Sequence, residues 1–240
     1  MSVDMNEATK ESTVKRLFDL GAHFGYARES RHPSTKPFLF GLKNKTIIID
    51  LEKTFESLEL AKDFVRGLGS AKKSLILVGT KKEAANVIER VANEYNLPYV
   101  NERWIGGTLT NFKEIRKRID RLVDLKDQES KGELTKYTKK ERNVIAKEVS
   151  DLERYFASLV TLNKLPGAIL VIDPKKEKIA VDEANRTNVP VIALANSDCD
   201  INGIAYPIVA NDAQLKVIDY IAREIAEAYQ AGLTEGEKTA

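Results

Sequence analysis

The sequence contains few of the residues that usually carry catalysis. Two histidines and one cysteine occur among its 240 residues. Cys199 cannot form a disulfide within the chain, so a reducing compartment is expected. No apolar run approaches the roughly 20 residues that span a bilayer, and the polar start MSVDMNEATKES lacks the basic and apolar regions of a signal peptide. These absences predict a cytoplasmic chain with no membrane contact.

The motifs of nucleotide-binding and hydrolytic enzymes are also missing. The turn at Gly79-Thr80 joins an apolar run to a helical pattern, and such a helix start offers free amides to an anion. A dinucleotide-binding turn needs further glycines there, and the P-loop-like stretch at residues 67–74 (GLGSAKKS) precedes its strand instead of following it. No G-x-S-x-G nucleophile motif occurs. We therefore expect no catalytic residue and no small-molecule substrate.

Metal binding has weak support in the sequence. His23 fits a packed, hydrogen-bonded histidine at a helix end better than a catalytic base. The acids Asp198, Asp200 and Asp212 offer the oxygen ligands that a cation prefers, but acidic loops at strand ends are common without a metal. We expect no cofactor and no bound metal, and we keep a structural cation near His23 and these acids as the weaker alternative.

Charge is unevenly distributed along the chain. The net charge is only +2, from 38 basic and 36 acidic residues. Residues 26–53 carry six basic and three acidic side chains, and residues 103–154 carry fourteen and ten, whereas residues 155–240 carry eight and twelve. This asymmetry favours one side that faces a polyanion, although solvated charge alone also explains many such patterns.

Short apolar runs alternate with amphipathic helical patterns. The central runs are continuously apolar, as parallel strands buried on both faces are. The expected strands are residues 46–50, 74–78, 98–100, 168–173, 191–195 and 206–209, and the expected helices are residues 54–68, 81–95, 177–187 and 212–229. This alternation predicts an α/β fold with a doubly wound parallel sheet. A flexible tail is expected at residues 233–240.

One segment interrupts the alternation. Its apolar residues recur at spacings of three and four with charged residues between them, which is typical of the narrow seam of a coiled coil. They are Phe112, Ile115, Ile119, Leu122 and Leu125 in one half, and Ile145, Val149, Leu152, Phe156 and Leu159 in the other. Residues 103–162 are therefore predicted to form an inserted antiparallel coiled-coil hairpin. Residues 1–102 and 163–232 together are predicted to form the sheet domain.

The stretch RWIGGTLTNF (residues 103–112) stands directly before the first hairpin arm. Its paired glycines suit either a phosphate-binding loop or a sharp turn between two structural units. Its position favours the turn. Trp104 is then expected to anchor the hairpin base, and Thr110 or Asn111 to cap the new helix.

Basic residues with interleaved aromatic residues favour an RNA-binding role. Such a combination contacts phosphates and stacks on unpaired bases. The expected RNA contacts are Arg28, Arg31, Lys36, Lys43, Lys45, Arg103, Lys113, Arg116 and Lys117. Tyr26, Phe38 and Phe40 lie among the first five, and we expect Phe38 and Phe40 to enter the core instead of stacking on bases.

The chain resembles the bacterial small-subunit ribosomal protein S2 family nearly from end to end. The matching segments are LGAHFG (20–25), PFLFGLKN (37–44), IIIDLEKT (47–54), ILVGTKKEA (76–84), NERWIGGTLTNF (101–112), LPGAILVIDPKKEKIAVDEA (165–184), VPVIALANSDCD (189–200) and YPIVANDAQLKVI (206–218). The resemblance implies a flavodoxin-like or Rossmann-like sheet domain with an inserted coiled-coil hairpin. It also implies a structural constituent of the small (30S) ribosomal subunit with no enzymatic activity. Such a protein contacts 16S ribosomal RNA and neighbouring ribosomal proteins, and helps to recruit the large messenger-binding ribosomal protein.

Several positions depart from the family pattern, and two other functions stay open. Tyr26 stands where the family commonly has a histidine, and Asn196-Ser197-Asp198 where it commonly has Asp-Thr-Asn, which weakens any metal site carried over from relatives. A nucleotide-dependent enzyme built on Gly79-Thr80 and the acids at 198–200 would need a second phosphate-binding element and a placed base. An adaptor whose hairpin binds a helix of another protein is the third possibility.

Overall fold

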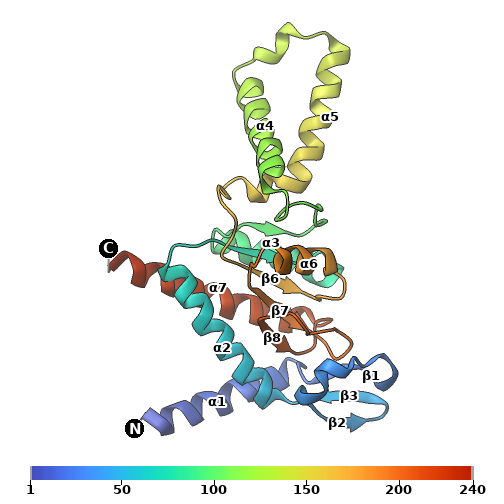
Figure 1. Cartoon of the computed structure of the whole chain (residues 1–240), viewed down its shortest axis with the longest axis vertical. Coiled ribbons are helices and arrows are strands. Elements are labelled where there is room, and N and C mark those ends of the chain that lie inside the picture. Colours follow the sequence, from blue (N-terminus) through green and yellow to red (C-terminus); the bar gives the residue numbers. More distant parts are fainter. Residues whose placement is uncertain (1, 239–240) are drawn as a thin grey trace.

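The centre of the molecule is a five-stranded parallel sheet (Figure 1). The computed structural model describes residues 2–238, with side chains for residues 10–134 and 136–237. The strands are β4 (Leu75–Val78), β5 (Tyr99–Val100), β6 (Ala168–Ile172), β7 (Val191–Ala195) and β8 (Tyr206–Val209), in the order β5-β4-β6-β7-β8. Every residue of β4, β6 and β7 is buried, which is why these runs are apolar throughout.

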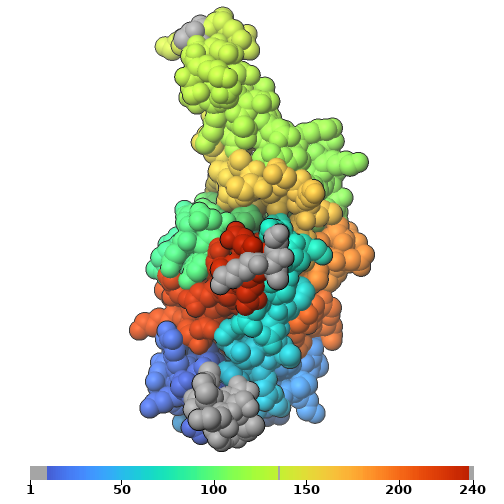
Figure 2. Space-filling model, turned by 90° about the vertical axis from the view of Figure 1, so that its left-hand side faces the viewer, coloured from blue at the N-terminus to red at the C-terminus, as the bar shows by residue number. Residues whose placement is uncertain are grey.

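Helices cover both faces of this sheet, as the doubly wound prediction requires. On one face lie α2 (Leu51–Ser70), α3 (Lys82–Glu94) and α7 (Leu215–Lys238), packed against alternate strand residues such as Leu77 and Leu170. Figure 2 shows α7 between α3 and α2 on that side. On the other face, α6 (Lys178–Arg186) packs against Ile76 and Ile169. The fold class is therefore confirmed.

A second, smaller sheet was not expected. The strands β1 (Phe24–Ala27), β2 (Leu39–Lys43) and β3 (Thr46–Ile49) form an antiparallel sheet in the order β1-β3-β2. The assignment of residues 46–50 to the parallel sheet is therefore wrong, because β3 pairs with two strands close to it in the chain. Two short helical turns, Arg28–Ser30 and Pro33–Phe38, connect β1 to β2. Ahead of this sheet runs α1 (Ser2–Asp19), which was not predicted either.

The inserted segment forms a helical hairpin that projects from the body as a narrow arm (Figure 2). Its arms are α4 (Phe112–Ser130) and α5 (Lys139–Phe156), joined by a turn at Glu133–Lys136. The seam residues Ile119, Leu122 and Leu125 are buried, together with Phe156. Toward the tip the arms separate (Figure 1) and leave a cleft of about 690 Å³. A helical hairpin is thus present, whereas a supercoiled coiled coil stays a prediction.

The last helix extends further than the sequence predicts. The helical pattern ended at residue 229, but α7 continues to Lys238; residues 239–240 lie outside the described part. The flexibility of residues 233–240 stays a prediction. The helix persists because its glycines lie against α2: a Cβ at Gly232 would stand 2.0 Å from the Arg66 carbonyl oxygen, and one at Gly236 would stand 2.6 Å from that of Ser70. Over residues 2–238, no helix combines the length and apolar character needed to cross a bilayer.

Candidate nucleic-acid interface

The nine predicted RNA contacts fall into two groups at opposite ends of the sheet domain (Figure 1). Residues 26–45, here called the basic loop, run from β1 through β2 into the turn before β3 and carry five of them. Residues 103–117, here called the hairpin base, lead into α4 and carry the other four. The structure therefore provides two separate surfaces and not one continuous site.

The basic loop is fixed to the loop that follows β7. The amide of Tyr26 donates to Ser197 Oγ at 2.9 Å, and the amide of His32 donates to the Ser197 carbonyl at 2.9 Å. The hydroxyl of Thr35, which is fully buried, donates to the same carbonyl at 3.0 Å. Hydrogen bonds between segments more than 150 residues apart in the chain hold this loop in one conformation. Its cations are thus carried on a fixed backbone.

The five cations of the basic loop face water. They are Arg28, Arg31, Lys36, Lys43 and Lys45, and all five are exposed. Within residues 10–134 and 136–237, none of their side chains has a hydrogen-bond or ion-pair partner. Unpaired cations on an ordered surface meet phosphate at a low conformational and desolvation cost. The geometry of this group suits a polyanion.

Several aromatic side chains near the basic loop are exposed. Phe40 is 80 % exposed, so the expectation that it enters the core is wrong, whereas Phe38 is half-buried. Leu39 pairs with Ile49 and Gly41 with Ile48, and the irregularity between these pairs leaves Phe40 outside the regular alternation. Phe18 on α1 and Phe24 on β1 are also exposed and both contact the ring of His23, and these two side chains are here called the aromatic patch.

His23 lies between two rings of this patch. Its imidazole stacks on Phe18 with ring centroids 4.4 Å apart and lies 4.0 Å from the ring of Phe24. Nδ1 has no hydrogen-bond partner among the described residues, so the expected hydrogen bond is not found. Burial, together with the charge of Lys43, lowers the pKa of His23 and favours the neutral ring. His23 therefore contributes ring surface and not charge.

Of the four cations in the hairpin base, two have no partner among the described residues and two are paired within the protein. Arg103 and Lys113 are exposed and have no side-chain partner in the described residues. Lys117 pairs with Glu114 at 2.7 Å on the outer face of α4. Arg116 points inward: its guanidinium donates to the carbonyls of residues 160 and 162, at 3.0 Å each, and to Asp120. Arg116 thus ties the two ends of the hairpin together and is poorly placed to meet RNA.

The glycine-rich turn before α4 does bind an anion, and the anion belongs to the chain. One carboxylate oxygen of Glu183, a buried residue of α6, accepts the amide of Gly107 at 2.6 Å and Trp104 Nε1 at 3.4 Å. The other oxygen accepts the amides of Leu109 at 2.9 Å and Thr110 at 3.2 Å. Burial acts to raise the pKa of Glu183, but these donors outweigh it and hold the pKa below its usual range.

The same turn corrects one expectation and supports another. Trp104 is buried in the core beneath the hairpin, as predicted for an anchor. Helix α4 begins after Asn111, but the side chain of Asn111 makes no capping hydrogen bond. The hydroxyl of Thr110 instead lies 3.3 Å from a Glu183 oxygen. Glu183 thus binds the turn ahead of α4, and the expected side-chain cap of the helix is not found.

The second candidate phosphate loop, Gly79-Thr80, also binds a carboxylate of the chain itself. The buried carboxylate of Glu177 accepts the amide of Thr80 at 3.0 Å and also its hydroxyl. Gly79 has no room for a side chain, because a Cβ there would stand 2.8 Å from Ile88 Cγ1. The Thr80 amide and hydroxyl that would receive a phosphate therefore already hold a carboxylate.

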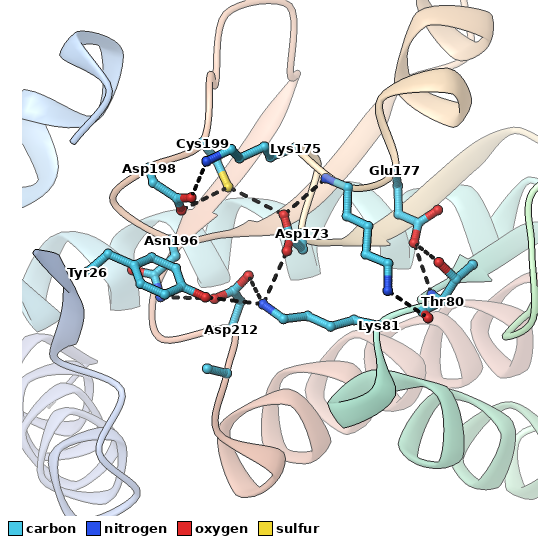
Figure 3. A network of polar contacts seen from close by, with 12 residues as sticks. Tyr26, Thr80, Lys81, Asp173, Lys175, Glu177, Asn196, Asp198, Cys199 and Asp212 are labelled. Carbon is cyan, nitrogen blue, oxygen red and sulfur yellow. Dashed lines mark hydrogen bonds and ion pairs between the residues drawn. The ribbon is translucent and has the colours of Figure 1, made fainter. Parts of the chain in front are cut away.

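An internal ion cluster lies near Thr80, at the carboxyl ends of the parallel strands (Figure 3). We call this region the sheet edge. Lys81 Nζ lies 2.9 Å from Asp212 Oδ2 and 3.1 Å from Asp173 Oδ2. Burial of Lys81 acts to lower its pKa, but the two carboxylates outweigh this and hold the pKa above its ordinary value. Asp173 adopts a left-handed backbone conformation, with φ of 64°, at the end of β6.

The surroundings of this cluster do not fit a metal ion. The amide nitrogen of Asn196 donates to Asp212 at 2.9 Å, and the ammonium of Lys81 is within 3.4 Å of the Tyr26 hydroxyl. Asp198 pairs with Lys175 at 2.7 Å, and Asp200 lies 3.7 Å from His32 Nδ1. In the part of the chain that is described, no three His, Cys, Asp or Glu side chains gather as a metal centre requires. A protein ammonium stands where a cation would have to bind.

Cys199 does not act as a nucleophile in this cluster. It is fully buried, and its sulfur lies 3.7–3.8 Å from carboxylate oxygens of Asp198 and Asp173. Burial and these negative charges raise the pKa of Cys199 to about 12. The thiolate is the reactive form, so this thiol is inert near neutral pH.

Further cations near the hairpin tip were missed by the sequence reasoning. Lys139, Lys140 and Arg142 are exposed at the start of α5 and have no side-chain partner among the described residues. Their signal was available in the sequence TKKER. Thr138 and Glu141 form a capping box that starts α5 there, so the basic pair begins a helix and does not lie in an irregular tip.

Comparisons with known proteins agree with this architecture. The family model for ribosomal protein S2 matches residues 17–232. The small ribosomal subunit protein uS2 of Roseiflexus sp. (strain RS-1) is 40% identical over 225 residues, covering 94% of this chain and 86% of that protein. The small ribosomal subunit protein uS2 of Coprothermobacter proteolyticus is 38% identical over 220 residues, covering 92% and 82%. That of Wolinella succinogenes is 38% identical over 232 residues, covering 95% and 86%. This chain therefore belongs to the ribosomal protein S2 family.

Proposed function

We propose that this chain is a structural constituent of the small ribosomal subunit that binds 16S ribosomal RNA and neighbouring ribosomal proteins in the cytoplasm. Membership of the S2 family gives the coarse function, a structural role in the ribosome without enzymatic activity. The observation that carries the finer proposal is the difference in charge pairing. Seven of the nine predicted contacts are exposed cations with no partner among the described residues, whereas both amide loops that resemble phosphate sites hold the chain's own glutamates.

The division of the cations into two groups supports a scaffold and not a nucleotide-binding site. A single small ligand cannot span surfaces at opposite ends of the sheet domain (Figure 1). An extended, folded RNA can meet both. The sheet domain between them is fully packed, so it fixes their separation. Each surface then contributes phosphate contacts to one large interface.

The salt dependence of binding tests this proposal. We would titrate 16S ribosomal RNA with the full chain by filter binding at several salt concentrations, and follow co-sedimentation with the small subunit in parallel. Let the salt slope be the magnitude of the decrease in log K with log salt concentration, where K is the association constant. Removal of one cation that meets a phosphate should lower this slope by about 0.7–0.9. The change Lys43→Gln with Lys45→Gln removes two unpaired cations beside β2 and should lower the slope by about 1.5. A flat salt response of the parent protein would reject the proposal.

A matched variant separates local contacts from net charge. Lys72 and Lys216 are also exposed and have no side-chain partner in the described residues, but they lie outside the basic loop and the hairpin base. The change Lys72→Gln with Lys216→Gln removes the same charge and should leave the slope almost unaltered. Equal reductions in the two double variants would mean that only overall charge matters.

We also propose that the chain helps to recruit the large messenger-binding ribosomal protein. The aromatic patch supports this role, because Phe18 and Phe24 are exposed on either side of His23, and exposed aromatic side chains that lie close together favour a protein contact over solvent. The change Phe24→Ser should reduce retention of that protein on reconstituted subunits. The change Ile179→Ser on α6, a side chain 57 % exposed, is the control. Unaltered retention with Phe24→Ser would assign the patch to another neighbour.

A further inference from the structure

We infer that Glu183 is the positioning residue that sets the direction of the hairpin relative to the sheet domain. Its carboxylate collects donors from the short segment between β5 and α4 and from nowhere else in the described residues. The donors are the amides of Gly107, Leu109 and Thr110, the hydroxyl of Thr110, and Trp104 Nε1. No cation of the described chain pairs with this carboxylate.

The charge and burial of Glu183 make this attachment directional. The side chain of Glu183 is only 6 % exposed, so water does not compete for its oxygens. Successive amides that converge on one carboxylate form a concave anion site with a single preferred geometry. Hydrogen bonds to a charged acceptor are about twice as strong as neutral ones. The turn is therefore held in one orientation on α6, a helix that belongs to the sheet domain.

The hairpin follows the turn as one body. Arg116 on α4 donates to the carbonyls of Val160 and Leu162, which lie just after α5. Both ends of the hairpin are thus joined near its base, and a rotation of the turn would move both arms. Two other polar side-chain links exist: an exposed pair between Arg154 and Glu102, and a hydrogen bond from the Ser158 hydroxyl to a backbone carbonyl. Apolar packing of the hairpin base in the core beside the sheet adds attachment without a fixed direction. Exposed pairs contribute little, so Glu183 is the main directional polar link.

This role rests on the proposed RNA-binding function, because direction matters only when both basic surfaces meet the same RNA. Two surfaces on a rigid frame bind as one bivalent unit with a high effective concentration. If the hairpin moves freely relative to the sheet domain, the effective concentration of the second surface falls. The protein then makes the same phosphate contacts with lower overall affinity for the RNA.

Distances between spin labels in the free protein test the positioning directly. In a Cys199→Ala background, we would label Lys147→Cys on the hairpin and Asn86→Cys on α3, two exposed positions. Double electron–electron resonance should give a narrow distance distribution in the parent and a broader or shifted one with Glu183→Gln. A second pair, Asn86→Cys with Lys216→Cys, lies within the sheet domain and should not change. An unaltered hairpin distance, or broadening of both pairs, would overturn the inference.

A milder variant and an RNA measurement complete the test. Thr110→Val removes one donor while keeping the side-chain volume, and should broaden the hairpin distance less than Glu183→Gln; it serves if Glu183→Gln does not fold. Binding of 16S ribosomal RNA should weaken about tenfold with Glu183→Gln, with a salt slope close to that of the parent. A broadened hairpin with unchanged RNA affinity would reject the functional consequence alone. An absence of RNA binding by the parent would reject the proposed function and leave the positioning result intact.

Discussion

The edge of the sheet and the basic surfaces use charge in opposite ways. At the sheet edge, Lys81 is enclosed by Asp173 and Asp212, and Glu177 binds the amide of Thr80. In the basic loop, cations such as Lys43 and Lys45 have no partner in the described part of the chain. The position where many α/β proteins bind a ligand is satisfied internally, whereas the surfaces with no internal role remain available. The charges of the ion cluster at the ends of the parallel strands are therefore paired within the protein, and the unpaired cations are at the exposed surfaces.

The ion cluster at the sheet edge should respond most strongly to mutation. Lys81→Met leaves the buried carboxylate of Asp212 and the partly buried one of Asp173 without their counter-ion, so we expect the free energy of unfolding to fall by about 3–5 kcal/mol. Lys175→Met breaks an ion pair in which the lysine is 61 % exposed, and should change stability by less than about 1 kcal/mol. Urea unfolding of both variants measures the difference. Equal stabilities would show that Asp212 carries no charge in the folded protein.

The carboxylate of Glu183 should give a smaller effect with a defined pH dependence. Glu183→Gln replaces an acceptor by an amide group facing several donors, and should lower the free energy of unfolding by about 2–3 kcal/mol near neutral pH. The pKa of Glu183 is lowered in the folded state, so its stabilisation is present above the unfolded pKa of about 4.3 and disappears as pH falls through the folded value.

Urea unfolding of the parent and the Glu183→Gln variant between pH 3 and 7 tests this dependence. The gap between the two proteins should be constant near pH 7 and shrink below about pH 4. Glu114→Gln on the exposed face of α4 is the control, because its carboxylate is in solvent and pairs only with Lys117 among the described residues. A gap that grows as pH falls would mean that the carboxylate is protonated in the folded state.

The elements of the fold were predictable where their signal is local. The strands β6 and β7 are continuously apolar because both faces are buried, and the spacing of Ile115, Ile119 and Leu122 reports the seam of α4. The antiparallel sheet escaped prediction because its strands are short and its pairing shifts register twice. The continuation of α7 beyond residue 232 runs along α2, a contact that the local sequence does not encode.

The candidate site was predictable by residue type but not by partner. Cations at residues 28–45 were identified from charge alone, and five of them prove exposed. Whether a polar group is already paired within the protein depends on partners that lie far away in the chain. The separation is 76 residues for Gly107 and Glu183, 97 for Thr80 and Glu177, and 131 for Lys81 and Asp212. Without an alignment or a fold, nothing in the sequence joins these pairs. A lysine that is paired within the protein and one that is unpaired cannot be told apart until the fold is known.

The smallest expected effect is the difference in salt slope between variants of two lysines of the same helix. Lys113 and Lys117 are one turn apart on α4; Lys113 has no side-chain partner among the described residues, whereas Lys117 lies 2.7 Å from Glu114. Lys113→Gln should lower the salt slope of RNA binding by about 0.7–0.9. Lys117→Gln should lower it less, because Glu114 already neutralises part of the charge and must be displaced by phosphate. Lys117→Gln combined with Glu114→Gln restores the local balance and should return the slope close to the parent value. If Lys117→Gln has the larger effect, phosphate competes successfully with the surface ion pair, and pairing in the free protein is then no guide to which cations meet RNA.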